Sequence, residues 1–163
     1  MTQEDLTIQR DIMRYTKDKR SANLVILAIV FDCLYFVSLY SVDVGSYYYT
    51  WSIGASIVYN LLFLLGAFLA SESVKNRKPG YSGLLIFLGV MQFVRIFYLP
   101  AKARAATVVV SGTELAAMTD SQFMYIAVCL AISGACCVVA AVISYINNKN
   151  LAEHMRMLEN KAA

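Results

Sequence analysis

Polar and charged side chains interrupt long apolar runs of this sequence, where they could bind an ion, a proton or a small polar solute. The members of this group are Asp32, Asn60, Gln92, Arg95 and Ser133. The carboxylate and the guanidinium carry opposite charges, while the amides and the hydroxyl supply hydrogen-bond donors and acceptors. Ionisable groups in apolar surroundings are costly and often mark functional sites, so these residues are the first candidates for chemistry.

Four apolar runs carry these residues, and each is long enough to form a transmembrane helix. They cover residues 23–42, 51–71, 81–99 and 123–146. A bilayer core about 30 Å thick needs roughly 20 residues of helix. The chain is 59% hydrophobic and only 15% charged, unlike a soluble domain. The sequence therefore predicts an all-α integral membrane protein, a four-helix transmembrane bundle built from a single domain of residues 1–163.

The distribution of Lys and Arg predicts which side of the membrane each loop occupies. The N-terminal segment, the loop between the second and third runs, and the tail are rich in both, whereas the last loop carries only Lys102 and Arg104. Because basic loops stay on the cytoplasmic side, we expect both termini in the cytoplasm and a location in the plasma membrane. Residues 1–21 would then form a short amphipathic cytoplasmic helix, and residues 147–163 a helical tail. Membrane orientation explains the basic residues, so no nucleic-acid partner is expected.

Counting along the helices places the polar side chains at similar depths. At about 1.5 Å per residue, Asp32 lies roughly 13 Å from the inner end of its run, and Asn60 and Gln92 roughly 16 Å from theirs. Arg95 lies about one turn further out, a distance that its long side chain can cover. We therefore expect an ion pair between Asp32 and Arg95, flanked by Asn60 and Gln92, with Ser133 opposite.

Three interpretations of this cluster remain open. In the first, the pair and the amides hold the helices in register. In the second, they bind an ion, a proton or a small polar solute. In the third, Arg95 extends to the outer headgroups, because it lies only about 7 Å from Pro100, and Asp32 stays unpaired. Pro100 is expected to end the third helix, since proline cannot continue the amide ladder.

The last loop, AKARAATVVVSGTELAAMTD, is the longest connection between two runs, with 20 residues. Its VVVSGT segment suggests a short strand and turn, and TELAAM one helical turn. Thr119 with Gln122 is typical of a capping box at the start of the fourth helix. Lys102 and Arg104 are candidates for contact with anions or lipids of the outer leaflet.

The fourth run is rich in small residues, which let membrane helices approach closely. They are Ala127, Ala131, Ser133, Gly134, Ala135, Ala140, Ala141 and Ser144. This composition favours packing within the chain, and some of these residues could face a second copy or another membrane subunit. The helix is expected to continue beyond residue 146 as an amphipathic extension.

Motifs for catalysis, cofactors and metals are missing from the sequence. Four cysteines lie within the runs without a CxxC motif, and the only histidine, His154, lies in the tail. We therefore predict no enzyme activity, no cofactor and no metal site.

The leading functional prediction is a non-enzymatic subunit or accessory component of a membrane assembly. Its partners would be the lipid bilayer and either further copies of the chain or other membrane subunits. The first alternative is a small oligomeric transporter or channel that uses the polar cluster around Asp32 and Arg95. The second is a lipid-binding protein that uses Arg95, Lys102 and Arg104.

Overall fold

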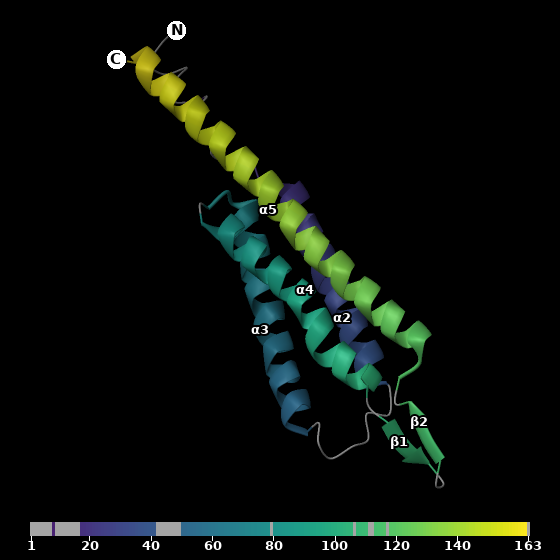
Figure 1. The fold of residues 1–163 in the computed structure, drawn as a ribbon. Helices are drawn as coiled ribbons and strands as arrows, with labels where there is room; N and C mark the ends of the chain where they lie inside the picture. Colours follow the sequence, from purple (N-terminus) through teal and green to yellow (C-terminus); the bar gives the residue numbers. More distant parts are fainter. Residues whose placement is uncertain are drawn as a thin grey trace.

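Four long helices and one short β-hairpin make up the described part of the computed structural model (Figure 1). The structure describes residues 8, 17–41, 50–78, 80–105, 107–110, 113–116 and 118–162. The elements are α2 (Lys19–Tyr40), α3 (Thr50–Lys75), α4 (Tyr81–Ala105), β1 (Thr107–Val110), β2 (Thr113–Ala116) and α5 (Asp120–Ala162). Each helix is long and apolar enough to cross a bilayer, as expected for a small multi-pass membrane protein.

α2 begins earlier than the apolar run of residues 23–42. The Asp18 carboxylate accepts hydrogen bonds from the backbone N–H of Ser21 at 3.2 Å and from its hydroxyl at 2.7 Å. A side-chain oxygen that accepts from an unpaired amide is a typical helix N-cap, so α2 starts at Lys19 rather than at Asn23. Most of the expected cytoplasmic helix of residues 1–21 lies outside the described residues.

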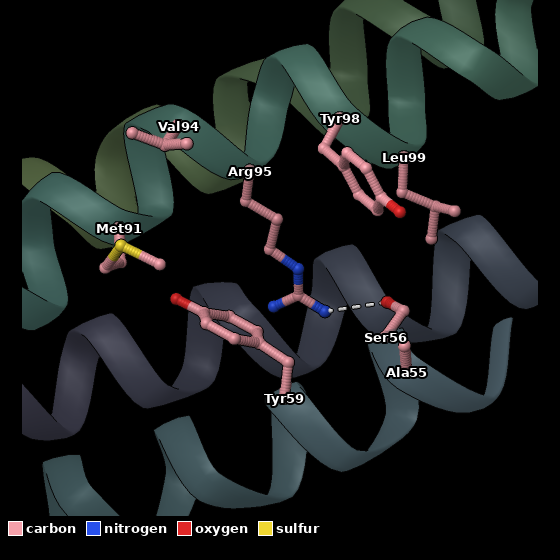
Figure 2. A pocket seen from close by; sticks show the side chains of 8 residues that line it. All are labelled: Ala55, Ser56, Tyr59, Met91, Val94, Arg95, Tyr98 and Leu99. Atoms are coloured by element: carbon pink, nitrogen blue, oxygen red, sulfur yellow. Dashed lines mark hydrogen bonds between the residues drawn. The ribbon is translucent and has the colours of Figure 1, made fainter. Parts of the chain in front are cut away.

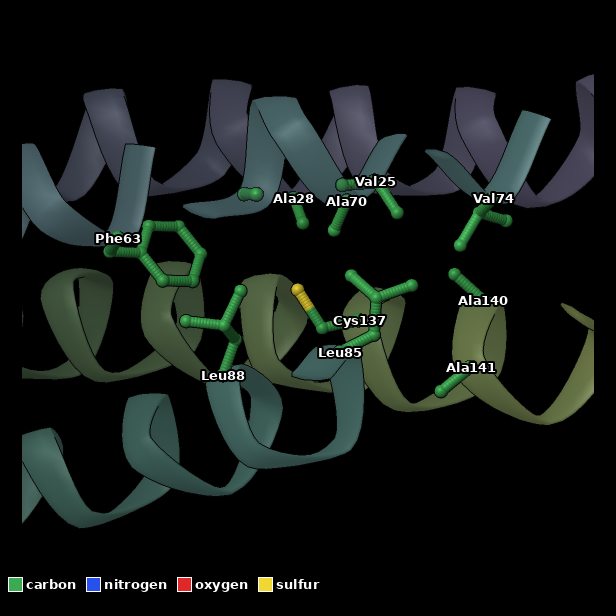
Figure 3. Packing of buried hydrophobic residues seen from close by; sticks show 11 residues of the cluster. Val25, Ala28, Phe63, Ala70, Val74, Leu85, Leu88, Cys137, Ala140 and Ala141 are labelled. Atoms are coloured by element: carbon green, nitrogen blue, oxygen red, sulfur yellow. The ribbon is translucent and has the colours of Figure 1, made fainter. Parts of the chain in front are cut away.

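The four helices lie side by side (Figure 1). α5 packs along α2 and α4, and α3 packs against the same two helices. Buried apolar side chains form two clusters in the interior. One cluster, drawn in Figure 3, includes Val25, Leu85 and Ala141, and the other includes Leu39 and Ile126. Along α2, Asp32 lies between the parts of the helix that contribute to the two clusters, so the polar residues separate two apolar regions.

α4 and α5 approach each other closely at Gly89 and Gly134. A Cβ atom at Gly89 would lie 3.0 Å from the carbonyl oxygen of Gly134, and a Cβ at Gly134 would lie 3.0 Å from that of Gly89. Such contacts are tighter than most real Cβ contacts, so glycine favours the close approach. Ala140, Ala141 and Ser144 of α5 are also buried. Much of the small-residue set of α5 therefore serves packing within the chain.

The prediction that Pro100 ends the third helix is wrong. α4 continues through Pro100, which is buried, to Ala105. Proline removes one amide donor, but helices in apolar surroundings tolerate it where neighbouring groups satisfy the freed carbonyl. Lys102 and Arg104 consequently belong to the last turn of α4. Arg95 lies about 15 Å from the Ala105 end of the helix, at 1.5 Å per residue.

The structure of the last loop also differs in part from the prediction. β1 is the strand that VVVSGT suggested, but TELA, expected as a helical turn, forms β2. The strands pair antiparallel, with Thr107 opposite Ala116 and Val110 opposite Thr113. Pairing with the β-branched residues of β1 outweighs the local helix preference of Glu, Leu and Ala, because strand formation depends on the neighbouring strand.

The start and the extension of α5 agree with the sequence. The Thr119 hydroxyl accepts a hydrogen bond from the Gln122 backbone N–H at 3.3 Å, and the Gln122 side chain accepts one from the Thr119 N–H at 3.0 Å. This reciprocal pair is the predicted capping box. The helix then runs for 43 residues. Leu158 in its extension is buried, whereas Arg156 is exposed.

Candidate functional site

Asp32 on α2 and Arg95 on α4 form an ion pair inside the protein. Nη1 of Arg95 lies 3.1 Å from Oδ1 of Asp32, and the two side chains are 6% and 0% exposed. The same Nη1 donates a hydrogen bond to Oδ1 of Asn60 on α3 at 2.9 Å. A buried pair of this kind is stable only where further hydrogen bonds hold both charges. The guanidinium therefore points into the protein and does not extend to the outer headgroups.

Gln92, one helical turn before Arg95, connects the ion pair to α5. Its Nε2 donates to Oδ1 of Asp32 at 2.8 Å and to Oγ of Ser133 at 3.4 Å. The Ser133 hydroxyl donates to the backbone carbonyl oxygen of Ala28 on α2 at 2.9 Å. The structure thus brings Asp32, Asn60, Gln92, Arg95 and Ser133 into one hydrogen-bonded group, here called the polar layer. All four helices contribute to it.

Aromatic and hydroxyl side chains complete the surroundings of the Arg95 guanidinium. Its Cζ lies 4.4 Å from the ring centre of Tyr35 and 4.8 Å from that of Tyr59, and its Nη2 donates to Oγ of Ser56 at 3.3 Å (Figure 2). Rings at this distance attract a cation through their negative faces. Tyr59 was not among the predicted site residues. Its signal in the sequence is its place three residues after Ser56 and directly before Asn60, on the same side of α3.

Two oxygen atoms of the polar layer have no hydrogen-bond partner among the described residues. They are Oδ2 of Asp32 and Oε1 of Gln92, and both side chains are fully buried. An unpaired buried acceptor costs free energy, and in native structures ordered water or a bound group commonly satisfies it. The layer therefore has unused capacity to accept hydrogen bonds.

A pocket of about 300 Å³ lies between α3 and α4 (Figure 2). It is lined by Ala55, Ser56, Tyr59, Met91, Val94, Arg95, Tyr98 and Leu99. Arg95 is the one polar-layer residue in this lining. The guanidinium is therefore shared between the polar layer and the pocket.

The two predicted outer-leaflet cations contact side chains of the protein. Nη2 of Arg104 lies 3.0 Å from Oδ1 of Asp120, and its Cζ lies 5.0 Å from the ring centre of Phe123. Nζ of Lys102 lies 4.3 Å from the ring centre of Tyr98. Arg104 thereby connects the end of α4 to the start of α5. Its side chain is 53% exposed, so it also remains accessible to a lipid headgroup.

A metal site within the described residues would need several His, Cys, Asp or Glu side chains close together. No cluster of three or more His, Cys, Asp or Glu side chains occurs in that part of the chain. Cys33, Cys129, Cys136 and Cys137 are all free thiols.

Comparison with known proteins finds no family model, no curated protein and no solved structure that matches this chain. What the protein does must therefore be inferred from its own residues and their geometry.

Proposed function

We propose that the protein is a non-enzymatic subunit or accessory component of a membrane assembly, located in the plasma membrane with both termini in the cytoplasm. The burial of the polar layer carries this proposal. Asp32 and Gln92 are fully buried, and Arg95 is 6% exposed. Their hydrogen bonds run to one another and to neighbouring helices, which supports a role in fixing helix register rather than in passing a solute.

α3 carries one apolar surface through which a partner would bind. Its inner side packs against α2 and α4. Large apolar side chains cover its outer side, where Leu61, Leu65 and Phe68 are 61%, 57% and 60% exposed. Lipid covers this face in a monomer, and a second copy or another membrane subunit covers it in an assembly. Because α3 lies at the margin of the helix group, a partner can reach it without disturbing the polar layer.

Chemical cross-linking in native membranes followed by purification in mild detergent tests this proposal. We expect a cross-linked complex of defined stoichiometry, weakened by Leu65→Trp on the outer side of α3. Val139→Trp is the matched control, since Val139 is 48% exposed but lies on α5. A stable monomer without a stoichiometric partner would contradict the proposal.

A small transporter or channel is the second candidate function. The unpaired Oδ2 of Asp32 and Oε1 of Gln92 favour it, because a proton or a cation would satisfy both oxygen atoms. Proteoliposomes loaded with a pH-sensitive or cation-sensitive dye test this candidate. Flux that Asp32→Asn abolishes would support transport. Flux no greater than that of protein-free vesicles would argue against it.

A further inference from the structure

We propose that the pocket between α3 and α4 binds a neutral, membrane-soluble molecule that carries a hydrogen-bond-accepting carbonyl group. The pocket has a volume of about 300 Å³, at the lower end of the range of small-molecule sites. Apolar side chains such as Met91, Val94 and Leu99 form much of its wall (Figure 2). An apolar wall with a few polar groups is the usual composition of a ligand site.

Arg95 supplies the pocket with unused hydrogen-bond donors. A guanidinium has five N–H groups and no acceptor. Its hydrogen bonds to Asp32, Asn60 and Ser56 use three of them. The remaining N–H of Nη2 and that of Nε have no hydrogen-bond partner among the described residues. Since Arg95 lines the pocket, a ligand there can accept from these groups.

Two tyrosines of the pocket lining carry hydroxyl groups. The Tyr59 hydroxyl is buried and has no hydrogen-bond partner among the described residues. Tyr98 lines the pocket across from Tyr59 and is 50% exposed (Figure 2). A hydroxyl can donate or accept, whereas a guanidinium only donates. The pocket therefore has more donors than acceptors, and a ligand that complements it presents an acceptor oxygen.

The ion pair between Asp32 and Arg95 favours a ligand without net charge. Asp32 lies 3.1 Å from Arg95 and already compensates its positive charge. An anion in the pocket would therefore be only partly compensated. Arg95 lies about 15 Å from the Ala105 end of α4, which is too deep for the charged headgroup of a phospholipid if that end reaches the interface. A carbonyl oxygen accepts hydrogen bonds without a net charge, so it avoids the cost of burying one.

The ligand would enter from the lipid phase. Ala55, Val94 and Tyr98 on the pocket wall are exposed, so the pocket opens on the outer surface of the helix pair. A second hollow of about 490 Å³ shares Ala55 and Tyr59 with it and extends along α3 to Trp51. This hollow gives room for an apolar tail while the carbonyl group lies against Arg95.

Equilibrium binding to the full chain in nanodiscs tests the proposal. The probes are undecyl methyl ketone, tridecane and tridecanoate, which share one chain length and differ in the polar group. Radiolabelled ketone is titrated, and the other two serve as competitors. We expect saturable binding of the ketone, weak competition by tridecane, and weaker competition by tridecanoate than by unlabelled ketone.

Two variants test whether the ketone binds in this pocket, and both leave the ion pair between Asp32 and Arg95 in place. Ala55→Phe fills the space where the two hollows meet and should abolish saturable binding, whereas Ala135→Phe on the exposed side of α5 should leave it unchanged. Tyr59→Phe removes one hydroxyl and should weaken ketone binding by about three- to tenfold, the usual effect of one hydrogen bond. Thermal unfolding of each variant verifies that it is folded.

Three results would overturn the proposal. The first is the absence of saturable ketone binding to the folded wild-type protein. The second is tridecanoate competing better than the unlabelled ketone, which would assign the pocket to an anion. The third is saturable binding that persists unchanged in both Ala55→Phe and Tyr59→Phe, which would place the ketone elsewhere.

Discussion

α4 contacts its two neighbours in different ways. Its contact with α5 is close, since Gly89 and Gly134 leave little room for a Cβ atom between the backbones. Its contact with α3 leaves a pocket of about 300 Å³ between Met91, Arg95 and their neighbours. The polar side chains of α4 are divided between the same two neighbours. Gln92 donates a hydrogen bond to Ser133 on α5, and Arg95 donates one to Asn60 on α3.

The α4–α5 contact and the α3–α4 contact therefore have different roles. Small residues at the α4–α5 contact give a rigid pair through van der Waals packing. At the level of the pocket, the α3–α4 contact consists of larger side chains and of hydrogen bonds from Arg95 to Asn60 and Ser56. α3 receives the hydrogen bonds of Arg95 through Asn60 and Ser56, so substitutions on the two contacts should have different consequences.

Arg95→Met should have the largest effect, because it leaves the Asp32 carboxylate buried without its counter-ion. Removing one partner of a buried ion pair lowers the free energy of unfolding by roughly 3–5 kcal/mol. Unfolding by SDS titration in mixed micelles measures the loss. Lys75→Met is the control, since Lys75 and Glu72 form an ion pair that is 34% and 52% exposed and should contribute under about 1 kcal/mol.

The double variant Asp32→Leu with Arg95→Met should recover much of the stability lost in Arg95→Met, because it removes both charges together. The charge exchange Asp32→Arg with Arg95→Asp tests the same coupling with the charges retained. Equal losses in Arg95→Met and Lys75→Met would show that the pair does not position α3.

Gly89→Ala should have the next largest effect. The new methyl group would lie 2.8 Å from Cγ2 of Val138 and 3.0 Å from the Gly134 carbonyl oxygen, so α4 and α5 would have to separate. Overpacking of this kind costs about 1–3 kcal/mol. Gly54→Ala is the matched control on α3, because nothing lies within 4 Å of its new Cβ. It should stabilise the protein slightly, as alanine favours helix over glycine. Similar results for both glycines in SDS titration would remove the distinction between the two contacts.

The Asp18 carboxylate, near the Lys75 end of α3, should make the stability depend on pH. Burial raises the pKa of Asp18, but hydrogen bonds from Asn147 and Ser21 outweigh this and hold the pKa below its ordinary value of 3.8. A lowered folded-state pKa stabilises the protein above 3.8, and this contribution disappears as the pH falls through the folded-state value.

The backbone N–H of Asp18 also donates to the carbonyl oxygen of Lys75 at 3.0 Å, which joins α2 to the end of α3. Thermal unfolding from neutral pH to below 3.8 should show a smaller loss of stability in Asp18→Asn than in the wild type. An equally steep loss in both proteins would mean that other carboxylates cause the acid sensitivity.

Helix positions and the polar cluster could be predicted because both depend on one-dimensional patterns. Apolar runs fix the helices, and helical rise converts sequence number into depth, which placed Asp32, Asn60 and Gln92 at one level. Tyr59 was missed because depth does not give the direction in which a side chain points. Only the packing of α3 against α4 places the Tyr59 ring beneath the guanidinium.

The two local errors have the same physical origin. The helix-forming residues of TELA became a strand because β1 lies beside them. Pro100 was expected to stop a helix that packing carries on to Ala105. In both places tertiary contacts outweighed a local preference, and no pattern within a few residues reports such contacts.

Ala55→Phe should have the smallest effect on stability and is the sharpest test of the contrast between the two contacts of α4. Ala55 is exposed and lines the pocket, so a phenyl ring there finds open space and should change the free energy of unfolding by no more than about 0.5 kcal/mol. Ala140→Phe introduces the same ring at a fully buried position of α5 and should cost at least about 1–3 kcal/mol. If both substitutions were equally destabilising, the space between α3 and α4 would be filled by side chains in the native protein, and the contrast would disappear.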